Sequence, residues 1–336
     1  MTAPTFTHLR RLTDAGGLYE HARGSTPRPE HGYCVDDVAR ALVVVCRDPE
    51  RPGDLGDLRE QYLAFVLAAQ APDGRFRNRR AVDLSWSDGP SVEDCWGRAL
   101  WGLGHALSRG DLTQHHGVLR AFRRGAAWRS PWVRSMSFAA LGAAQVLRVE
   151  PGERSALDLL SAAGHCLRRR DTRAGWPWPE PRLTYANAAI PEAMIEVGSA
   201  LGDENLVTEG LRLLGWLLAL QTRQEHLSMV PATGWGPGQT GPAYDQQPIE
   251  VATLADACAC ALRVTGDPLW LRGLAMCAAW FDGDNDSETP VYDLETGAGY
   301  DGLERTGRND NRGAESTLAL LSTQQQDRLL SLSRLG

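Results

Sequence analysis

The sequence predicts an all-α fold, a closed (α/α)6 toroid of six helical hairpins in a single domain. Six polar motifs with aromatic neighbours recur at similar intervals, and each stands before an apolar, helix-forming stretch. The links between these stretches alternate between tight turns and long irregular loops, as a ring of hairpins requires. The six motifs occupy residues 31–37, 86–94, 129–135, 183–188, 244–250 and 309–315.

Twelve helices are predicted from apolar residues at i, i+3, i+4 spacing. In chain order they span 8–21, 42–45, 58–70, 95–107, 117–128, 138–147, 156–167, 190–201, 206–221, 249–264, 269–281 and 314–321. Tight links, which predict antiparallel neighbours, lie at 151–152, 202–203 and 266–268. Long loops, each leading into a motif, lie at 71–91, 171–187, 222–247 and 282–312. The toroid is predicted to span 1–322, with a polar tail at 323–336.

Composition excludes several classes of function. The net charge of −7 and the pI near 5.7 leave no basic surface for nucleic acid. The longest apolar stretches, 42–46 and 213–220, are shorter than the roughly 20 residues that span a bilayer, so we expect a cytoplasmic protein without a membrane segment. All 35 basic residues are arginine, which excludes Schiff-base, pyridoxal-phosphate and P-loop chemistry. The seven cysteines lack zinc-site spacing, so no metal or cofactor is expected.

Acidic residues gather where the predicted inner helices begin. Each alone is explained as a helix cap or as an acid placed favourably in the helix dipole. Together they predict crowded carboxylates that raise one another's pKa, so that one stays protonated beside an ionised partner. Inverting glycoside hydrolysis needs such a pair, an acid and a base. The predicted catalytic residues are Asp36, Asp37, Glu93, Asp94, Asp245 and Glu250.

The long loops also carry aromatic side chains, whose flat faces suit the C–H faces of sugar rings, beside polar groups that suit hydroxyls. A small carbohydrate is therefore the predicted ligand. The alternative for each tryptophan is packing of a loop onto the barrel. Trp132 and Trp176 belong to this loop group. The predicted substrate-binding residues are His31, Tyr33, Arg40, Trp86, Arg98, Trp178, Tyr185, Asn187, His226, Trp235, Tyr244, Gln246, Asn311 and Glu315.

Two histidines offer a rival mechanism. His31 and His226 lie in the motif-bearing loops, and a histidine pair across a helical barrel could move a proton beside a sugar carbonyl. That chemistry would make the protein a sugar epimerase or isomerase. The alternative is that both rings brace loops through hydrogen bonds.

Four segments, 32–42, 91–101, 244–250 and 313–317, resemble motifs of bacterial (α/α)6-toroid proteins. Those proteins are often labelled glycosyltransferase-like or glycosyltransferase-associated and belong to the six-hairpin glycosidase-like superfamily. The resemblance implies the toroid, sugar chemistry and an association with a glycosyltransferase. This chain departs from the motifs of those proteins at Val38 and Ala186, where Asn and Asp are expected, and in the loop at 230–232.

The departure at Ala186 introduces a third hypothesis, a non-catalytic glycan-binding partner of a glycosyltransferase. The chain itself shows no strand, glycine-rich turn and helix of the kind that binds a sugar nucleotide. Of the three hypotheses, the sequence favours the inverting hydrolase.

Overall fold

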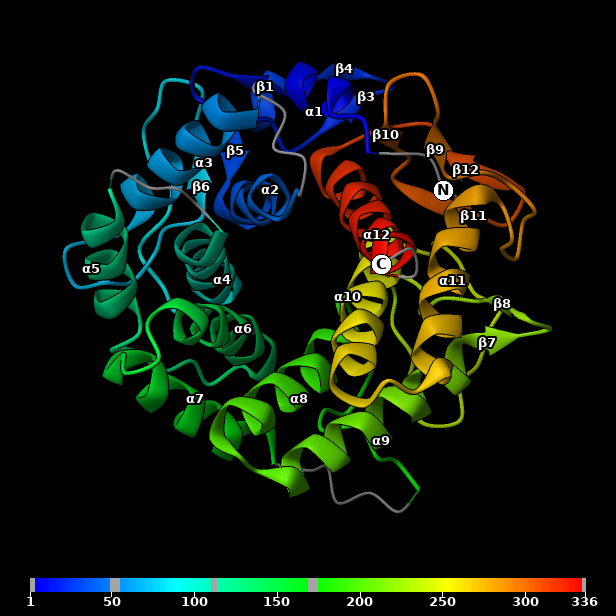
Figure 1. Ribbon diagram of the computed structural model, residues 1–336. Helices are drawn as coiled ribbons and strands as arrows, with labels where there is room; N and C mark the ends of the chain where they lie inside the picture. Colours follow the sequence, from blue (N-terminus) through cyan, green and yellow to red (C-terminus); the bar gives the residue numbers. More distant parts are fainter. Residues whose placement is uncertain (1–3, 49–54, 110–113, 169–174, 334–336) are drawn as a thin grey trace.

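The computed structural model describes residues 4–48, 55–109, 114–168 and 175–333, and there the predicted (α/α)6 toroid is confirmed. Six inner helices form a closed ring, because each packs against the next and the last packs against the first (Figure 1). The inner helices are α2 (Val35–Arg47), α4 (Asp94–Arg109), α6 (Val133–Val149), α8 (Ala189–Leu201), α10 (Pro248–Thr265) and α12 (Ala314–Ser333).

In the described ranges six outer helices surround this ring, and each has its main contact with one inner helix. Five of them follow their inner partner in the chain, whereas the short first helix packs against the last, which closes the ring. The outer helices are α1 (Thr7–Leu12), α3 (Leu55–Ala69), α5 (His115–Gly125), α7 (Arg154–Leu167), α9 (Glu204–Gln221) and α11 (Pro268–Asp282).

The first predicted helix, 8–21, is wrong beyond Leu12. The side chain of Asp14 accepts the backbone N–H groups of Gly16 and Gly17, at 2.8 and 3.2 Å. Gly17 has φ of +152°, a conformation that favours glycine, so the chain turns back instead of continuing the helix. The result is a hairpin of β1 (Thr13–Asp14) and β2 (Gly17–Leu18).

Further two- and three-residue strands pair in the loops of the described chain, all antiparallel. The η1 turn (Pro29–His31) precedes the strand that leads into α2. The pairs are β3 (Ala22–Arg23) with β4 (Thr26–Pro27), β5 (Tyr33–Cys34) with β6 (Arg79–Arg80), β7 (Thr222–Arg223) with β8 (His226–Leu227), β9 (Tyr292–Asp293) with β10 (Ala298–Gly299), and β11 (Gly302–Glu304) with β12 (Gly307–Asn309).

The remaining helices match the predictions, with differences at their ends. The short helix predicted at 42–45 is the later part of α2, whose start carries Asp36, Asp37 and Arg40 and therefore lacks a continuous apolar pattern. The last helix, α12, continues beyond residue 322, through the first part of the segment for which a polar tail was expected. No helix in the described ranges combines the length and the apolar character that a bilayer span requires.

Small residues bring two inner helices unusually close. A Cβ atom at Gly97 of α4 would lie 2.3 Å from the Ser135 carbonyl oxygen, and one at Gly142 of α6 would lie 2.2 Å from the Leu100 carbonyl oxygen. Only glycine fits at such distances, so α4 and α6 pack backbone to backbone. This contact sets the spacing between the residues that open the two helices.

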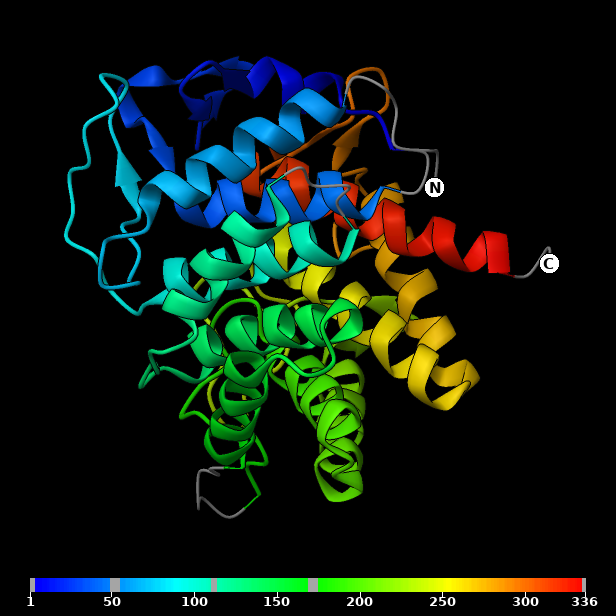
Figure 2. The same ribbon diagram turned by 60° about the vertical axis from the view of Figure 1, so that its left-hand side comes forward.

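Figure 2 shows the long segment between α3 and α4 on the opposite side of the ring from the C-terminus.

Candidate active site

A cavity of about 1050 Å³ opens at the end of the ring where the inner helices begin. It is lined by the first turns of α2, α4, α6 and α12 and by the loops that precede α8 and α10. The cavity lining thus includes residues from all six motifs. Of the predicted site residues, those lining it are Asp36, Asp37, Arg40, Glu93, Asp94, Arg98, Tyr185 and Glu315.

Arg40 ties the start of α2 to the start of α12. Its guanidinium group lies 2.7 Å from Glu315 Oε2 and 3.3 Å from Asp37 Oδ1, and the side chain is 9% exposed. Burial raises the pKa of Asp37 from 3.8 to about 6, although Arg40 opposes the rise. Burial also raises the pKa of Glu315, but Arg40 and Arg98 together outweigh it, so that pKa falls below its ordinary value.

Asp36 precedes Asp37 in the first turn of α2 and has different partners. Its Oδ2 accepts a hydrogen bond of 2.9 Å from Asn78, and its Oδ1 lies 3.6 Å from Nε of Arg98. Burial raises the pKa of Asp36; Arg98 and Arg40 oppose this rise, and the negative charge of Asp94 adds to it. Asp36 therefore holds its proton to higher pH than an ordinary aspartate.

Asp94 opens α4, and two hydroxyl groups donate hydrogen bonds to its side chain. Ser135 Oγ donates to its Oδ1 at 2.7 Å, and the Tyr185 hydroxyl donates to its Oδ2. These two hydrogen bonds fix the orientation of the Asp94 carboxyl group at the cavity wall. The same Tyr185 ring is covered by the guanidinium of Arg134, 4.7 Å from the ring centroid, which helps fix its position.

Arg98 forms part of the cavity floor. It is 2% exposed, its guanidinium lies 4.4 Å from the centre of the Phe138 ring, and its Nε and Nη1 atoms have no hydrogen-bond partner. A buried donor of this kind suits a ligand oxygen. Glu93, one residue before α4, is an exposed carboxylate at the cavity wall.

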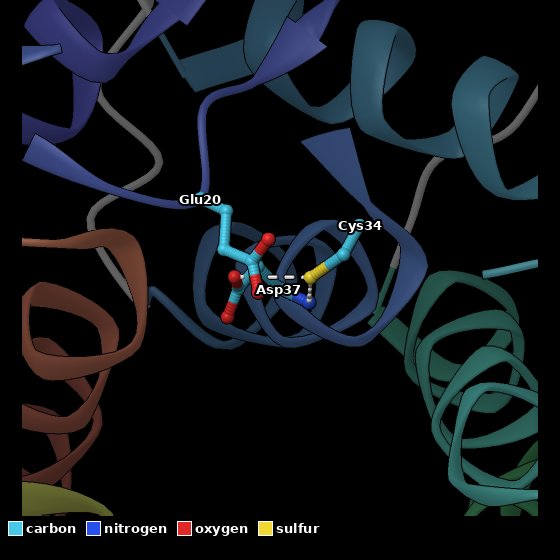
Figure 3. A group of neighbouring side chains, drawn as sticks. All are labelled: Glu20, Cys34 and Asp37. Atoms are coloured by element: carbon cyan, nitrogen blue, oxygen red, sulfur yellow. Dashed lines mark hydrogen bonds between the residues drawn. The ribbon is translucent and has the colours of Figure 1, made fainter. Parts of the chain in front are cut away.

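Glu20, Cys34 and Asp37 point toward one another at one side of the cavity, as Figure 3 shows. Their ligand atoms lie within 4.8 Å of one another, a spacing that could hold a metal ion. Both carboxylates are already paired with arginines, however: Glu20 with Arg79 and Asp37 with Arg40. The thiol of Cys34 donates to Asp37 Oδ2 at 3.1 Å and accepts the Asp37 N–H, and burial raises its pKa. We therefore assign this cluster a structural role at the start of α2.

Several predicted site residues lie outside the cavity lining, and most of them contact the surrounding loops. Tyr33 is 1% exposed, donates to Asp14 at 2.9 Å and stacks on Tyr19. Trp86 packs against Phe65, with the Arg80 guanidinium over its ring. The remaining members of this group are His31, edge-on to His21; Asn311, which accepts the Gly24 N–H; Tyr244, beneath Arg305; and Asp245, an exposed side chain.

His226 belongs to a partly buried hydrogen-bond network between loop residues. Its Nε2 lies 3.0 Å from Asp286 Oδ1, and Gln246 donates to the other oxygen of Asp286 at 2.6 Å. The Oε1 atom of Gln246 accepts the Met229 N–H at 3.0 Å. Every one of these groups has a partner within the network, so His226 and Gln246 hold loops together rather than face the cavity.

Trp178 and Trp235 cannot stack on a ligand in this structure, because they are 0% and 3% exposed. Trp178 stacks on Trp216, with ring centroids 6.1 Å apart, and the backbone of Trp235 pairs with that of Leu183. Both rings pack a long loop onto the barrel, which is the alternative that the sequence left open for loop tryptophans.

Glu250 and Asn187 form a buried pair beside the cavity rather than in its lining. The side-chain amide of Asn187 donates to Glu250 Oε2 at 2.8 Å, while Oε1 has no hydrogen-bond partner. Burial raises the pKa of Glu250 from 4.5 to about 7, against the lowering effect of Asn187. The neighbouring Ala186 is fully buried with φ of +47°, a conformation in which Asn and Asp are commoner than Ala.

The cavity also contains residues outside the predicted substrate-binding set. Trp132, which the sequence placed among the loop tryptophans, lines it, as does Arg134, whose position in the motif at 129–135 could have identified it. Glu20, His21, Asn78, Glu180, Arg182 and Asp301 come from loops with no repeated pattern, and only the folded chain brings them here.

Comparison with known proteins identifies the fold. No protein-family model and no curated protein matches the sequence. Among solved structures, the chain is similar to a sugar epimerase from a ruminal bacterium (TM-score 0.70, 12% identity, covering 96% of this chain and 95% of that one). It is also similar to a GH76 α-mannanase of Bacteroides thetaiotaomicron (TM-score 0.70, 10% identity, covering 98% and 95%).

A third similar structure is an inactive variant of the α-1,6-mannanase of Salegentibacter, with two consecutive aspartates changed to asparagine, in complex with α-1,6-mannotriose. Its TM-score is 0.66 at 12% identity, covering 96% of each chain. At such identities the likeness shows the toroid and leaves the reaction open.

Proposed function

We propose that this protein is a carbohydrate-active enzyme, an inverting glycoside hydrolase that acts on an oligosaccharide through carboxylates at one end of the toroid. The observation that carries the proposal is the pair of Asp36 and Asp94. They lie in the first turns of adjacent inner helices, line the same cavity and have different hydrogen-bond partners.

The surroundings assign a role to each carboxylate. Burial and the charge of Asp94 keep Asp36 protonated to higher pH, which suits a general acid that protonates the leaving oxygen. Hydrogen bonds from Tyr185 and Ser135 hold the Asp94 side chain in place beside Asp36, and we assign Asp94 the role of the general base that activates water. Arg98 on the floor offers donors to sugar oxygens between them.

One solved neighbour supports this assignment. The mannanase variant that binds mannotriose is inactive with two consecutive aspartates replaced by asparagine. This chain also has consecutive aspartates, Asp36 and Asp37, in the first turn of an inner helix. We propose that Asp37, buried beneath Arg40, positions the first turn while Asp36 acts on the substrate.

The epimerase hypothesis in its histidine form has less support. His226 is bonded to Asp286 and His31 packs against His21, and neither lines the cavity. Among the described residues, His21 is the only histidine in the lining. A proton shuttle between two histidines would therefore lack its second member.

Mutation and product analysis test the proposal. Asp36→Asn and Asp94→Asn are expected to lower hydrolysis of a panel of manno- and gluco-oligosaccharides by a factor of about 10³ or more, with the fold retained. Asp245→Asn is the matched control, because that aspartate is exposed and lies outside the cavity lining. Proton NMR of the first product should show the inverted anomer.

Other outcomes select other functions. An isomerised sugar, rather than a released one, would establish an epimerase and refute the hydrolase. Binding without turnover of any glycan would favour the non-catalytic module, consistent with Ala186 in place of an acid. Membership of the glycosyltransferase-associated family, an association with a glycosyltransferase and a cytoplasmic location stay proposals from the sequence.

A further inference from the structure

The structure sorts the eleven tryptophans of the chain into different environments. Trp132 is 61% exposed and lines the cavity, and no other tryptophan of the described chain does so. The other loop tryptophans are packed: Trp176 is 6% exposed, Trp178 and Trp235 are buried, and Trp86 lies under Arg80. An exposed indole at the edge of a polar cavity is therefore a local exception in this fold.

The backbone of Trp132 is held at a defined position. It is the residue immediately before α6, and its N–H donates to Ser130 Oγ at 3.1 Å. Ser130 is itself 7% exposed, and its N–H contacts the sulfur of Met136 in the next turn. The indole thus projects from a fixed helix start rather than from a free loop.

A second wall of the cavity comes from the loop before α8, at residues 180–182. Arg134, in the first turn of α6, makes a two-pronged ion pair with Glu180, one contact being 3.3 Å, and Trp176 Nε1 donates to the Glu180 carbonyl oxygen at 2.7 Å. Arg182 donates to the Gly234 carbonyl oxygen at 3.0 Å. The wall is therefore preorganised, and it presents charged groups that can bind hydroxyls.

Trp132 lies one inner helix beyond Asp94 around the ring, because α4 packs against α6. The cavity volume of about 1050 Å³ slightly exceeds the usual range for ligand sites, about 300–1,000 Å³. A single sugar beside Asp36 and Asp94 would leave the part between Trp132 and residues 180–182 unfilled. The cavity therefore has room for further sugar units on the α6 side.

We infer that Trp132, with the wall at 180–182, forms a stacking subsite for a sugar ring that is remote from the cleaved bond. The indole covers the apolar C–H face of that ring, and Glu180 and Arg182 contact its hydroxyls. The preferred substrates are neutral oligosaccharides of three or more units. This inference rests on the proposed hydrolase function and specifies its substrate class.

The test compares three variants on mannose- and glucose-based oligosaccharides of two to six units. Trp132→Ala should raise KM for trisaccharides and longer chains about tenfold, a change of about 1.4 kcal/mol, with kcat nearly unchanged. It should also abolish the gain in kcat/KM with chain length, and Trp132→Phe should restore part of it because a flat ring remains.

Trp128→Ala is the matched control. Trp128 is a nearby tryptophan, 38% exposed and outside the cavity lining, whose Nε1 donates to the Asp73 carbonyl oxygen at 2.7 Å under the guanidinium of Arg75. Its loss should leave KM and the chain-length dependence unchanged. Titration of an Asp94→Asn protein with the same sugars should shift the tryptophan fluorescence, and the added Trp132→Ala change should remove most of that shift.

The outcomes separate this inference from the proposed function. Cleavage of oligosaccharides with the same KM and chain-length dependence in Trp132→Ala as in the parent protein would overturn the subsite and leave the hydrolase intact. Sugar binding whose fluorescence shift does not depend on Trp132 would also overturn it. Failure of every oligosaccharide to bind or be cleaved would refute both proposals together.

Discussion

Replacement of Glu250 by glutamine should change the pH dependence of stability without disturbing the fold. Glu250 is 2% exposed in the first turn of α10, and only one of its two oxygens, Oε2, is bonded, to Asn187. A glutamine carbonyl can accept the same hydrogen bond. The substitution therefore removes a buried charge and keeps the contact between α10 and the loop before α8.

The magnitude follows from the pKa of this group. Burial raises the pKa of Glu250 from 4.5 to about 7, so the folded state binds the proton more tightly than the unfolded state. Its contribution to stability is complete below about pH 4.5, declines as pH rises, and is lost above about pH 7. The difference between the two pKa values corresponds to about 3 kcal/mol of unfolding free energy.

Urea unfolding of both proteins from pH 4.5 to 8 provides the measurement. At pH 4.5 the parent protein and Glu250→Gln should be about equally stable, because a protonated glutamate resembles glutamine. At pH 8 the variant should be the more stable by about 3 kcal/mol. Glu295→Gln, at an exposed position, is the control and should show no such divergence. A difference between parent and Glu250→Gln that stays constant with pH would refute the argument.

Three further changes test other parts of the structure. Ala186→Gly should raise the unfolding free energy by about 1 kcal/mol, because Ala186 has φ of +47°. Ala188→Gly is the control and should lower the unfolding free energy, because Ala188 has φ of −67°. Urea unfolding of both variants at pH 7 provides the comparison. Arg47→Met should destabilise the protein by about 3–5 kcal/mol, since it leaves Asp256, 2.6 Å away, as an unpaired buried charge; a normal melting temperature would contradict this. Tyr185→Phe removes one of the two hydroxyl donors to the proposed base and should lower kcat about tenfold or more, measured with any oligosaccharide that the parent cleaves; unchanged kcat would exclude a role for this hydrogen bond.

Much of the fold could be predicted from local features of the chain. The i, i+3, i+4 spacing of apolar residues identified the helices, because a helix buries a stripe with that period whatever its partner. Pro248 at the first position of α10, and Gly202 with φ of +70° after α8, mark boundaries through backbone sterics alone. The six recurring motifs then indicated that the inner helices begin at one end of a ring. The error at 8–21 arose where Asp14 and two glycines form a turn inside an otherwise helical pattern.

The site could be predicted only where its residues stand at helix starts. Residues in the first turns of α2, α4 and α12 line the cavity. The sequence shows that they stand at the starts of inner helices, and that position largely determines whether a side chain faces the cavity. Loop residues carry no such constraint. Trp178 and Trp132 both precede inner helices in tryptophan-bearing loops, yet one is fully buried and the other is 61% exposed.

The sequence by itself determined the helices, their hairpin order and the end of the ring at which polar groups gather, because these depend on periodicity and on residues near in the chain. Only the tertiary structure decided which of those groups face one another. Asp94 meets Tyr185, 91 positions away, and Arg40 meets Glu315, 275 positions away. Such pairings depend on how the ring closes and how each long loop folds over it, and burial, charge and pKa at the site follow from that closure.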